Sequence, residues 1–313
     1  MSSAIVSAAV CTDADTGSFF ELANRAGRSC LARAGVSSDR IGLVINAGVF
    51  RDSNISEPAV AALIQKRLEV GLEYSTGQLP AFSFDLMNGA TGVVHALMAA
   101  QCFLAPGEVE YALVVAGDTH PSTEREREDF PYSVSGAAIL LRSSRDAGGF
   151  GTPHTTEIGD AARPTAWVDL DAAGSDGRNA LTLRGGTGDP LDAAEQVVRA
   201  CLADEGIDPG DFATGKAVLL APAPVPGFRE RLAYRLGMPS TAIAGVHPAV
   251  GDPYSAAPIH AYASAAAEGL LDAAGAVIFL AADDSTAACL AYHPLPLATS
   301  GSVAELRTNH TGG

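Results

Sequence analysis

The stretch Phe84-Asp-Leu-Met-Asn-Gly-Ala-Thr-Gly92 (FDLMNGATG) joins two elements that the sequence predicts clearly. The apolar run Phe82 to Leu86 indicates a strand, and Val93 to Ala100 indicates a helix with almost no polar side chains. A turn between such a strand and such a helix presents its residues at the helix N-terminus. The residues presented here, Gly89 to Thr91, include no strong nucleophile.

The composition is that of a large globular protein. With 313 residues, 47% of them hydrophobic, the chain can bury a substantial core. No uninterrupted apolar stretch reaches the roughly 18 residues of a membrane span, and the N-terminus lacks the basic start of a secretory signal. We therefore expect a cytoplasmic protein. Its net charge of −16 argues against nucleic acid and membranes as partners, because both require a basic face.

Cysteines and glycines suggest neither a metal site nor a dinucleotide site. The five cysteines are odd in number, widely spaced and without a CxxC pair, which predicts free thiols. The other possible metal ligands show no metal-binding spacing, so no metal is expected. Gly185-Gly-Thr-Gly188 precedes Asp189-Pro190 and not a helix of the dinucleotide-binding type, so a nicotinamide or flavin cofactor is not expected.

Two halves of the chain resemble each other. Ala23 to Val49 reads as an Ala-rich helix, a Gly-containing linker, an acidic residue and an apolar strand, and Ala193 to Ala221 repeats that order. Downstream, the strand pattern Ala112 to Asp118 is matched by Ala276 to Asp283. This predicts a duplicated strand–helix–strand unit. The alternative is a pair of unrelated Rossmann-like domains.

Strands that alternate with helices of this length predict an α/β protein with mostly parallel sheets. The helices after Gly92 and Pro258 are nearly free of polar residues, which suits a buried central layer. We therefore predict two halves, residues 1–165 and 166–313, that form a five-layer α-β-α-β-α sandwich. The Gly-, Asp- and Pro-rich segment Arg145 to Asp189 is expected to connect them.

Over nearly its whole length, the chain resembles the thiolase superfamily, and within it the β-ketoacyl-acyl carrier protein synthase III group. Ala26 to Val49 is similar to the family's opening helix, linker and strand. Phe84 to Gly92 is similar to its nucleophile turn, Phe-Asp-x-x-x-x-Cys-x-Gly. Ser133 to Leu141 resembles the Gly-Asp-Gly-Ala-Gly-Ala strand, and Gly251 to Ala257 resembles the Gly-Asn-x-x-Ser-Ala segment. The resemblance implies the thiolase-like fold.

The resemblance also implies a site from which the usual chemistry is missing. In the family a cysteine at the helix N-terminus attacks an acyl thioester, while a histidine and an asparagine support condensation with a malonyl thioester. The substrates are acyl-CoA or phosphopantetheine thioesters, and no cofactor is used. Aligned by these motifs, the cysteine position is Ala90, the histidine position is Pro222 and the asparagine position is Asp252.

One interpretation is a catalytically silent subunit in a specialised fatty-acid or polyketide pathway. Such a chain would keep the fold and form a homodimer, or a heterodimer with an active ketosynthase, and an acyl carrier protein is a further possible partner. A deliberate cysteine-to-alanine change made to trap a substrate would explain Ala90. It would not explain Pro222.

The second interpretation is a noncanonical acyltransferase that moves an acyl group to a small acceptor. Thr91 would lie at the same helix N-terminus and would supply a hydroxyl, if a base were near. The candidate bases are Asp252, His247 and His260. The alternative for Thr91 is a hydroxyl that bonds its own backbone, and the alternative for the two histidines is hydrogen bonding to backbone groups.

Family positions also suggest residues that surround the site. Four are predicted to contact the acyl substrate: Met87, Asn88, Phe130 and Ser255. Three arginines on one predicted helix form a basic stripe that would dock the carrier protein: Arg229, Arg231 and Arg235. The alternative for this stripe is helix-end charge complementarity with Glu230. The alternating charges of Glu124 to Asp129 predict a solvated face or a subunit boundary.

Overall fold

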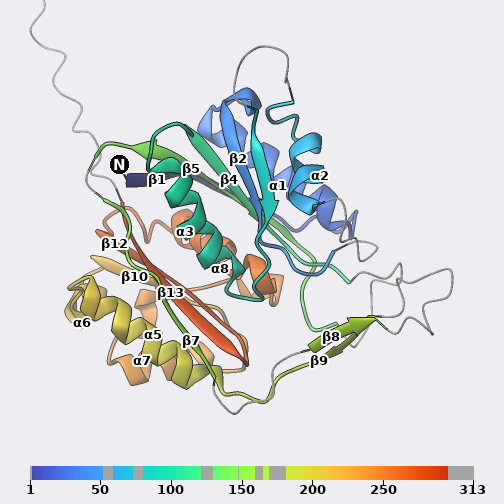
Figure 1. Ribbon diagram of the computed structural model, residues 1–313. Coiled ribbons are helices and arrows are strands. Elements are labelled where there is room, and N and C mark those ends of the chain that lie inside the picture. Colours follow the sequence, from blue (N-terminus) through green and yellow to red (C-terminus); the bar gives the residue numbers. More distant parts are fainter. Residues whose placement is uncertain are drawn as a thin grey trace, which may run out of the picture.

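The computed structural model describes residues 2–51, 59–72, 80–120, 130–146, 148–158, 165–168 and 181–294. Two sheets lie face to face with two helices between them, and further helices cover the outer face of each sheet (Figure 1). This is the predicted five-layer arrangement. The charged run Glu124 to Asp129 lies outside the described residues.

The first sheet has the strand order β1 (Ser2–Cys11), β5 (Gly136–Ser144), β4 (Tyr111–Ala116), β2 (Ile41–Asn46) and β3 (Phe82–Asp85). Strands β4, β2 and β3 are parallel, whereas β5 is antiparallel to both of its neighbours. Helices α1 (Phe19–Ala34) and α2 (Val60–Arg67) cover the outer face.

The second sheet repeats this topology. Its order is β6 (Gly149–Phe150), β13 (Thr286–His293), β12 (Ala276–Ala282), β10 (Ala217–Leu220) and β11 (Ile243–Ala244), and β7 (His154–Glu157) also pairs with β13. Directions match strand by strand, with β12, β10 and β11 parallel and β13 antiparallel. The duplication inferred from sequence is confirmed, and unrelated domains are excluded. The outer helices are α5 (Pro190–Asp204), α6 (Pro209–Ala213) and α7 (Phe228–Leu236).

Two details differ from the sequence predictions. The sheets are mixed and not mostly parallel, because β5 in the first sheet and β13 in the second are antiparallel to their neighbours. In the second sheet, β12 and β13 are joined directly by Asp283–Ser285, and a connection that short forces an antiparallel pair. The chain passes from the first sheet to the second between Ser144 and Gly149, ahead of the boundary predicted at residues 165 and 166. Strands β8 (Thr165–Val168) and β9 (Leu181–Arg184) pair only with each other among the described strands.

The central layer consists of α3 (Gly92–Leu104) and α8 (Ala257–Ala267). Their apolar side chains join residues from both sheets in one buried cluster, as the lack of polar residues predicted. None of the described helices has the length and hydrophobicity to cross a bilayer. All five cysteines are free thiols, as expected.

A buried carboxylate joins the two halves. Asp118, directly after β4, accepts hydrogen bonds from the backbone amides of Val49 (3.0 Å), Phe50 (2.8 Å) and Ser255 (3.1 Å), and from Ser255 Oγ (2.5 Å). These bonds favour the ionised form, but burial outweighs them and raises the pKa of Asp118 to about 6. Ser255 is fully buried by this contact.

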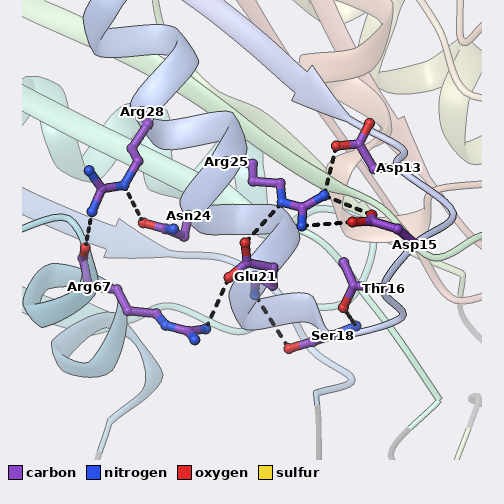
Figure 2. A network of polar contacts seen from close by, with 9 residues as sticks. All are labelled: Asp13, Asp15, Thr16, Ser18, Glu21, Asn24, Arg25, Arg28 and Arg67. Atoms are coloured by element: carbon purple, nitrogen blue, oxygen red, sulfur yellow. Dashed lines mark hydrogen bonds and ion pairs between the residues drawn. The ribbon is translucent and has the colours of Figure 1, made fainter.

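At the surface, ion pairs connect α1 to its neighbours (Figure 2). Arg25 pairs with Asp13, Asp15 and Glu21, and Glu21 also pairs with Arg67 of α2 at 3.6 Å. Ser18 is the N-cap of α1, and its hydroxyl accepts from the Glu21 amide. Because this network is solvent-exposed, we expect its contribution to stability to shrink at high salt.

Candidate functional site

A cavity of about 420 Å³ lies where the two halves meet. Its wall includes Ala90 at the start of α3, Pro222 just after β10, and Asp252 in the loop before α8. The structure therefore brings together the three positions aligned with the family's cysteine, histidine and asparagine. The two halves contribute to one site, as the duplicated architecture implies.

The turn before α3 depends on Gly89. This residue has a positive φ of 55°, a conformation that favours glycine. A Cβ there would also lie 3.1 Å from both Asp283 Oδ2 and the Tyr254 hydroxyl oxygen. The close approach leaves Ala90 at the helix N-terminus, 5% exposed and facing the cavity with a methyl group.

Thr91 does not offer its hydroxyl to the cavity. Its Oγ1 donates to the Asn88 carbonyl oxygen at 2.8 Å and accepts from Asn88 Nδ2 at 3.1 Å. The side chain is 1% exposed and is not part of the cavity wall. The local backbone contact, which was the alternative to a nucleophilic role, is the one that the structure shows.

The two candidate histidines also lie outside the cavity wall. His247 is exposed, and its Nδ1 accepts from the Ala249 amide at 3.2 Å. His260 in α8 is 4% exposed, and among the described residues its Nε2 has no hydrogen-bond partner. Burial lowers the pKa of His260 to about 4. Of the four residues proposed for nucleophilic or base chemistry, only Asp252 lines the cavity.

The buried His260 predicts a measurable pH dependence of stability. Because its folded pKa is depressed, the unfolded chain takes up a proton first, and the free energy of unfolding falls as pH falls through the unfolded pKa of 6.5. Between about pH 7.5 and pH 5.5 the contribution is about 1.3 kcal/mol. Urea unfolding of His260→Leu should lack this component. An identical pH slope in the variant and the wild type would contradict the prediction.

Two acidic residues that sequence reasoning missed line the same cavity. Asp283 and Asp284 follow directly after β12, and Asp284 Oδ2 accepts a hydrogen bond from the Gly186 amide. Burial raises the pKa of Asp284 and also that of Asp252, whose Oδ1 accepts from the Tyr254 amide at 2.9 Å. Their position in the sequence could have indicated this, because they directly follow a strand, and the carboxyl ends of parallel strands commonly border ligand sites.

Aromatic residues form another part of the wall. The rings of Tyr132 and Tyr254 stack with centroids 4.0 Å apart, and both residues line the cavity. Burial raises the pKa of each hydroxyl, so both stay protonated. Phe130, predicted to contact substrate, instead packs edge-on against Tyr132 at 5.4 Å and is not part of the cavity wall.

The other predicted contact residues do not face the cavity. Met87 is 51% exposed, Asn88 is exposed, and Ser255 is bonded to Asp118. None of the three is part of the wall. Their roles toward a substrate stay predictions. Among the described residues, no cluster of side chains is suited to hold a metal ion.

The predicted basic stripe on α7 is largely neutralised within the fold. Arg231 pairs with Asp189 at 3.2 Å, and Arg235 pairs with Asp192 and with Glu195 at 3.3 Å. Arg229 makes no ion pair with any described residue, and it lies over Gly245, where a Cβ would be 2.1 Å from its Nη1. Docking of a carrier protein on these arginines stays a prediction.

Comparison with known proteins agrees with this fold, although no family model matches the sequence. A β-ketoacyl-[acyl-carrier-protein] synthase III of Paramagnetospirillum magneticum is 31% identical over 132 residues, which cover 41% of this chain and 37% of the relative. The match thus spans little more than a third of that relative's length.

Solved structures match over most of the chain. The 3-oxoacyl-(acyl carrier protein) synthase III of Pseudomonas aeruginosa superposes with a TM-score of 0.78 at 18% identity, covering 94% of this chain and 99% of that one. The priming β-ketosynthase of the R1128 polyketide pathway gives 0.69 at 17% identity, with 95% and 97% covered. The chain has the thiolase-like fold of these ketosynthase III structures.

Proposed function

We propose that this protein is a catalytically silent ketosynthase III-like subunit that works beside acyl thioesters in a specialised fatty-acid or polyketide pathway. One observation carries the proposal. The cavity at the N-terminus of α3 presents Ala90 and Pro222 at the two reactive positions, and no Cys, Ser, Thr, His or Lys is among the described residues that line it. Acyl transfer from a thioester through a covalent intermediate ordinarily uses one of these side chains as the nucleophile, whereas this wall supplies aspartates and buried tyrosines whose hydroxyls stay protonated.

The charges of the cavity support the same conclusion. Condensation builds negative charge on a thioester oxygen, and enzymes stabilise it with hydrogen-bond donors or cations. Here Asp252, Asp283 and Asp284 line the cavity and oppose that charge. They would also repel the carboxylate of a malonyl thioester. The acyltransferase alternative finds no support in the geometry, because the Thr91 hydroxyl is bonded to Asn88.

A silent subunit needs a surface for its active partner, and we place it on the edge strand β3. Phe82 is 55% exposed on this strand, and its ring packs 5.5 Å from Phe84 and 6.0 Å from Phe103, which is 38% exposed. On the described part of the sheet, β3 pairs only with β2. An edge strand with exposed aromatic rings favours pairing with another chain. The occupant we propose is a ketosynthase-like chain that carries the cysteine.

Intact-mass analysis tests the silent role. After incubation with acyl-CoA or acyl-carrier thioesters, this chain should carry no acyl adduct, and an added partner ketosynthase should become acylated on its own cysteine. An adduct on Thr91, or turnover by this chain alone that Thr91→Val or Asp252→Ala removes, would show that it is an enzyme. Background reaction at the exposed Cys102 is removed by Cys102→Ser.

Pairing is tested separately by charge insertion. Phe82→Lys should abolish co-purification with the partner ketosynthase, because it places a charge in the proposed apolar interface. Tyr234→Lys is the matched control, since Tyr234 is 88% exposed on α7, which packs on the second sheet, whereas β3 is the edge strand of the first sheet. Size-exclusion chromatography with light scattering gives the readout. A complex that survives Phe82→Lys, or that Tyr234→Lys also dissociates, would contradict the proposed surface.

A further inference from the structure

The cavity carries negative charge with no balancing cation. Its ionisable lining residues are Asp252, Asp283, Asp284, Tyr132 and Tyr254, and the described residues of the wall include no lysine, arginine or histidine. Both tyrosines stay protonated, as shown above. The three carboxyl groups therefore set the electrostatic potential in the cavity. Their negative charges repel one another and any anion that enters.

One carboxylate oxygen in this group has no hydrogen-bond partner among the described residues. Asp283 is 9% exposed, and its Oδ1 accepts from the Ser285 amide (2.9 Å), Ser285 Oγ (2.8 Å) and the Thr286 amide (3.0 Å). No described residue donates to its Oδ2, which faces the space between Gly89 and the Tyr254 hydroxyl. This oxygen is not among the fully enclosed atoms without a partner, so a cationic donor that enters the cavity can reach it and form a charge-assisted hydrogen bond.

The remaining wall suits an organic group and not a bare ion. Proline and aliphatic side chains cover much of it, including Pro222, Pro224, Val225 and Ala281, and the tyrosine rings add flat apolar surface. A volume of about 420 Å³ lies within the range of small-molecule sites. The described residues include no group of side chains that could hold a metal ion.

We propose that this cavity binds a small protonated amine with an apolar or aromatic body. The ammonium group donates to Asp283 Oδ2, with Asp252 and Asp284 adding favourable charge. The body lies against the prolines and the tyrosine rings, where the ring faces also attract a cation. This binding role goes beyond the silent-subunit role and does not depend on it, because it needs neither acylation nor a partner chain.

Isothermal titration calorimetry of the full chain with three ligands of similar size tests the charge preference directly. Phenethylamine should bind at least about tenfold more tightly than 2-phenylethanol, because a hydrogen bond to a charged group is worth more than one to a neutral group. Phenylacetate should bind more weakly than the alcohol. Equal affinities for the amine and the alcohol, tighter binding of phenylacetate, or no saturable binding of the amine would each overturn the proposal.

Two variants locate the site. Asp283→Asn keeps the carbonyl oxygen that accepts from Ser285 and Thr286 but places an NH₂ donor toward the cavity, so the preference for amine over alcohol should fall severalfold, to the smaller preference that Asp252 and Asp284 provide. Asp39→Asn removes the same charge from an exposed turn and should leave the preference unchanged. Loss of preference in both variants, or in neither, would overturn the assignment. Thermal melts confirm that the variants are folded.

Discussion

Replacing Asp118 by alanine should lower the free energy of unfolding by about 3–5 kcal/mol, among the largest effects expected for a single substitution in this chain. The alanine leaves four donors without an acceptor, namely the amides of Val49, Phe50 and Ser255 and the Ser255 hydroxyl. These donors come from both halves of the molecule, so the loss loosens the contact that joins them. Urea unfolding followed by circular dichroism measures the change in the free energy of unfolding.

The destabilisation caused by Asp118→Ala should depend on pH and should grow as the pH falls. The folded pKa of Asp118 lies above its unfolded value of 3.8, so the folded protein binds the proton more tightly and this group favours folding more strongly as pH falls through about 6. Between about pH 7.5 and pH 5.5 the gap between wild type and Asp118→Ala should widen by about 1 kcal/mol. Asp39→Ala, at an exposed acid, is the control. A loss below about 1 kcal/mol for Asp118→Ala would contradict the structural role.

Placing a cysteine at position 90 should convert a chain that forms no acyl adduct into one that does. The thiol of Ala90→Cys would lie at the N-terminus of α3, where the helix dipole and free amides favour a thiolate. The three aspartates in the wall oppose this and raise the pKa of the thiol. The rate of acylation by acyl-CoA should therefore increase steeply with pH above neutrality.

Intact-mass analysis in a Cys102→Ser background measures the adduct without interference from the exposed native thiol. We expect no condensation with malonyl thioesters, because Pro222 supplies no base and the carboxylates repel the malonyl group. Thr91→Val in the Ala90→Cys chain should leave acylation intact. Failure of Ala90→Cys to form any adduct above background would mean that acyl thioesters do not reach the cavity, which would count against an acyl-related role.

Much of the fold could be predicted because its signals are local. Strand and helix periodicity around Phe84 to Gly92 identified the turn, and the absence of polar residues after Gly92 and Pro258 identified the two central helices. The repeated order of elements predicted the duplication. The mixed direction of the sheets was missed, since periodicity does not encode strand direction; in the second sheet the antiparallel pair follows from the short connection Asp283–Ser285.

The sequence by itself determined the layers, the duplicated topology and the absence of a cysteine and a histidine at Ala90 and Pro222, because these depend on residue type and spacing along the chain. Only the tertiary structure decided which side chains share the cavity. In the folded protein the Thr91 hydroxyl bonds to Asn88, and Asp283 and Asp284 line the same cavity as Asp252. Hydrogen-bond partners and charge neighbours come from segments far apart in the chain, and spacing along a sequence does not encode their distances in space.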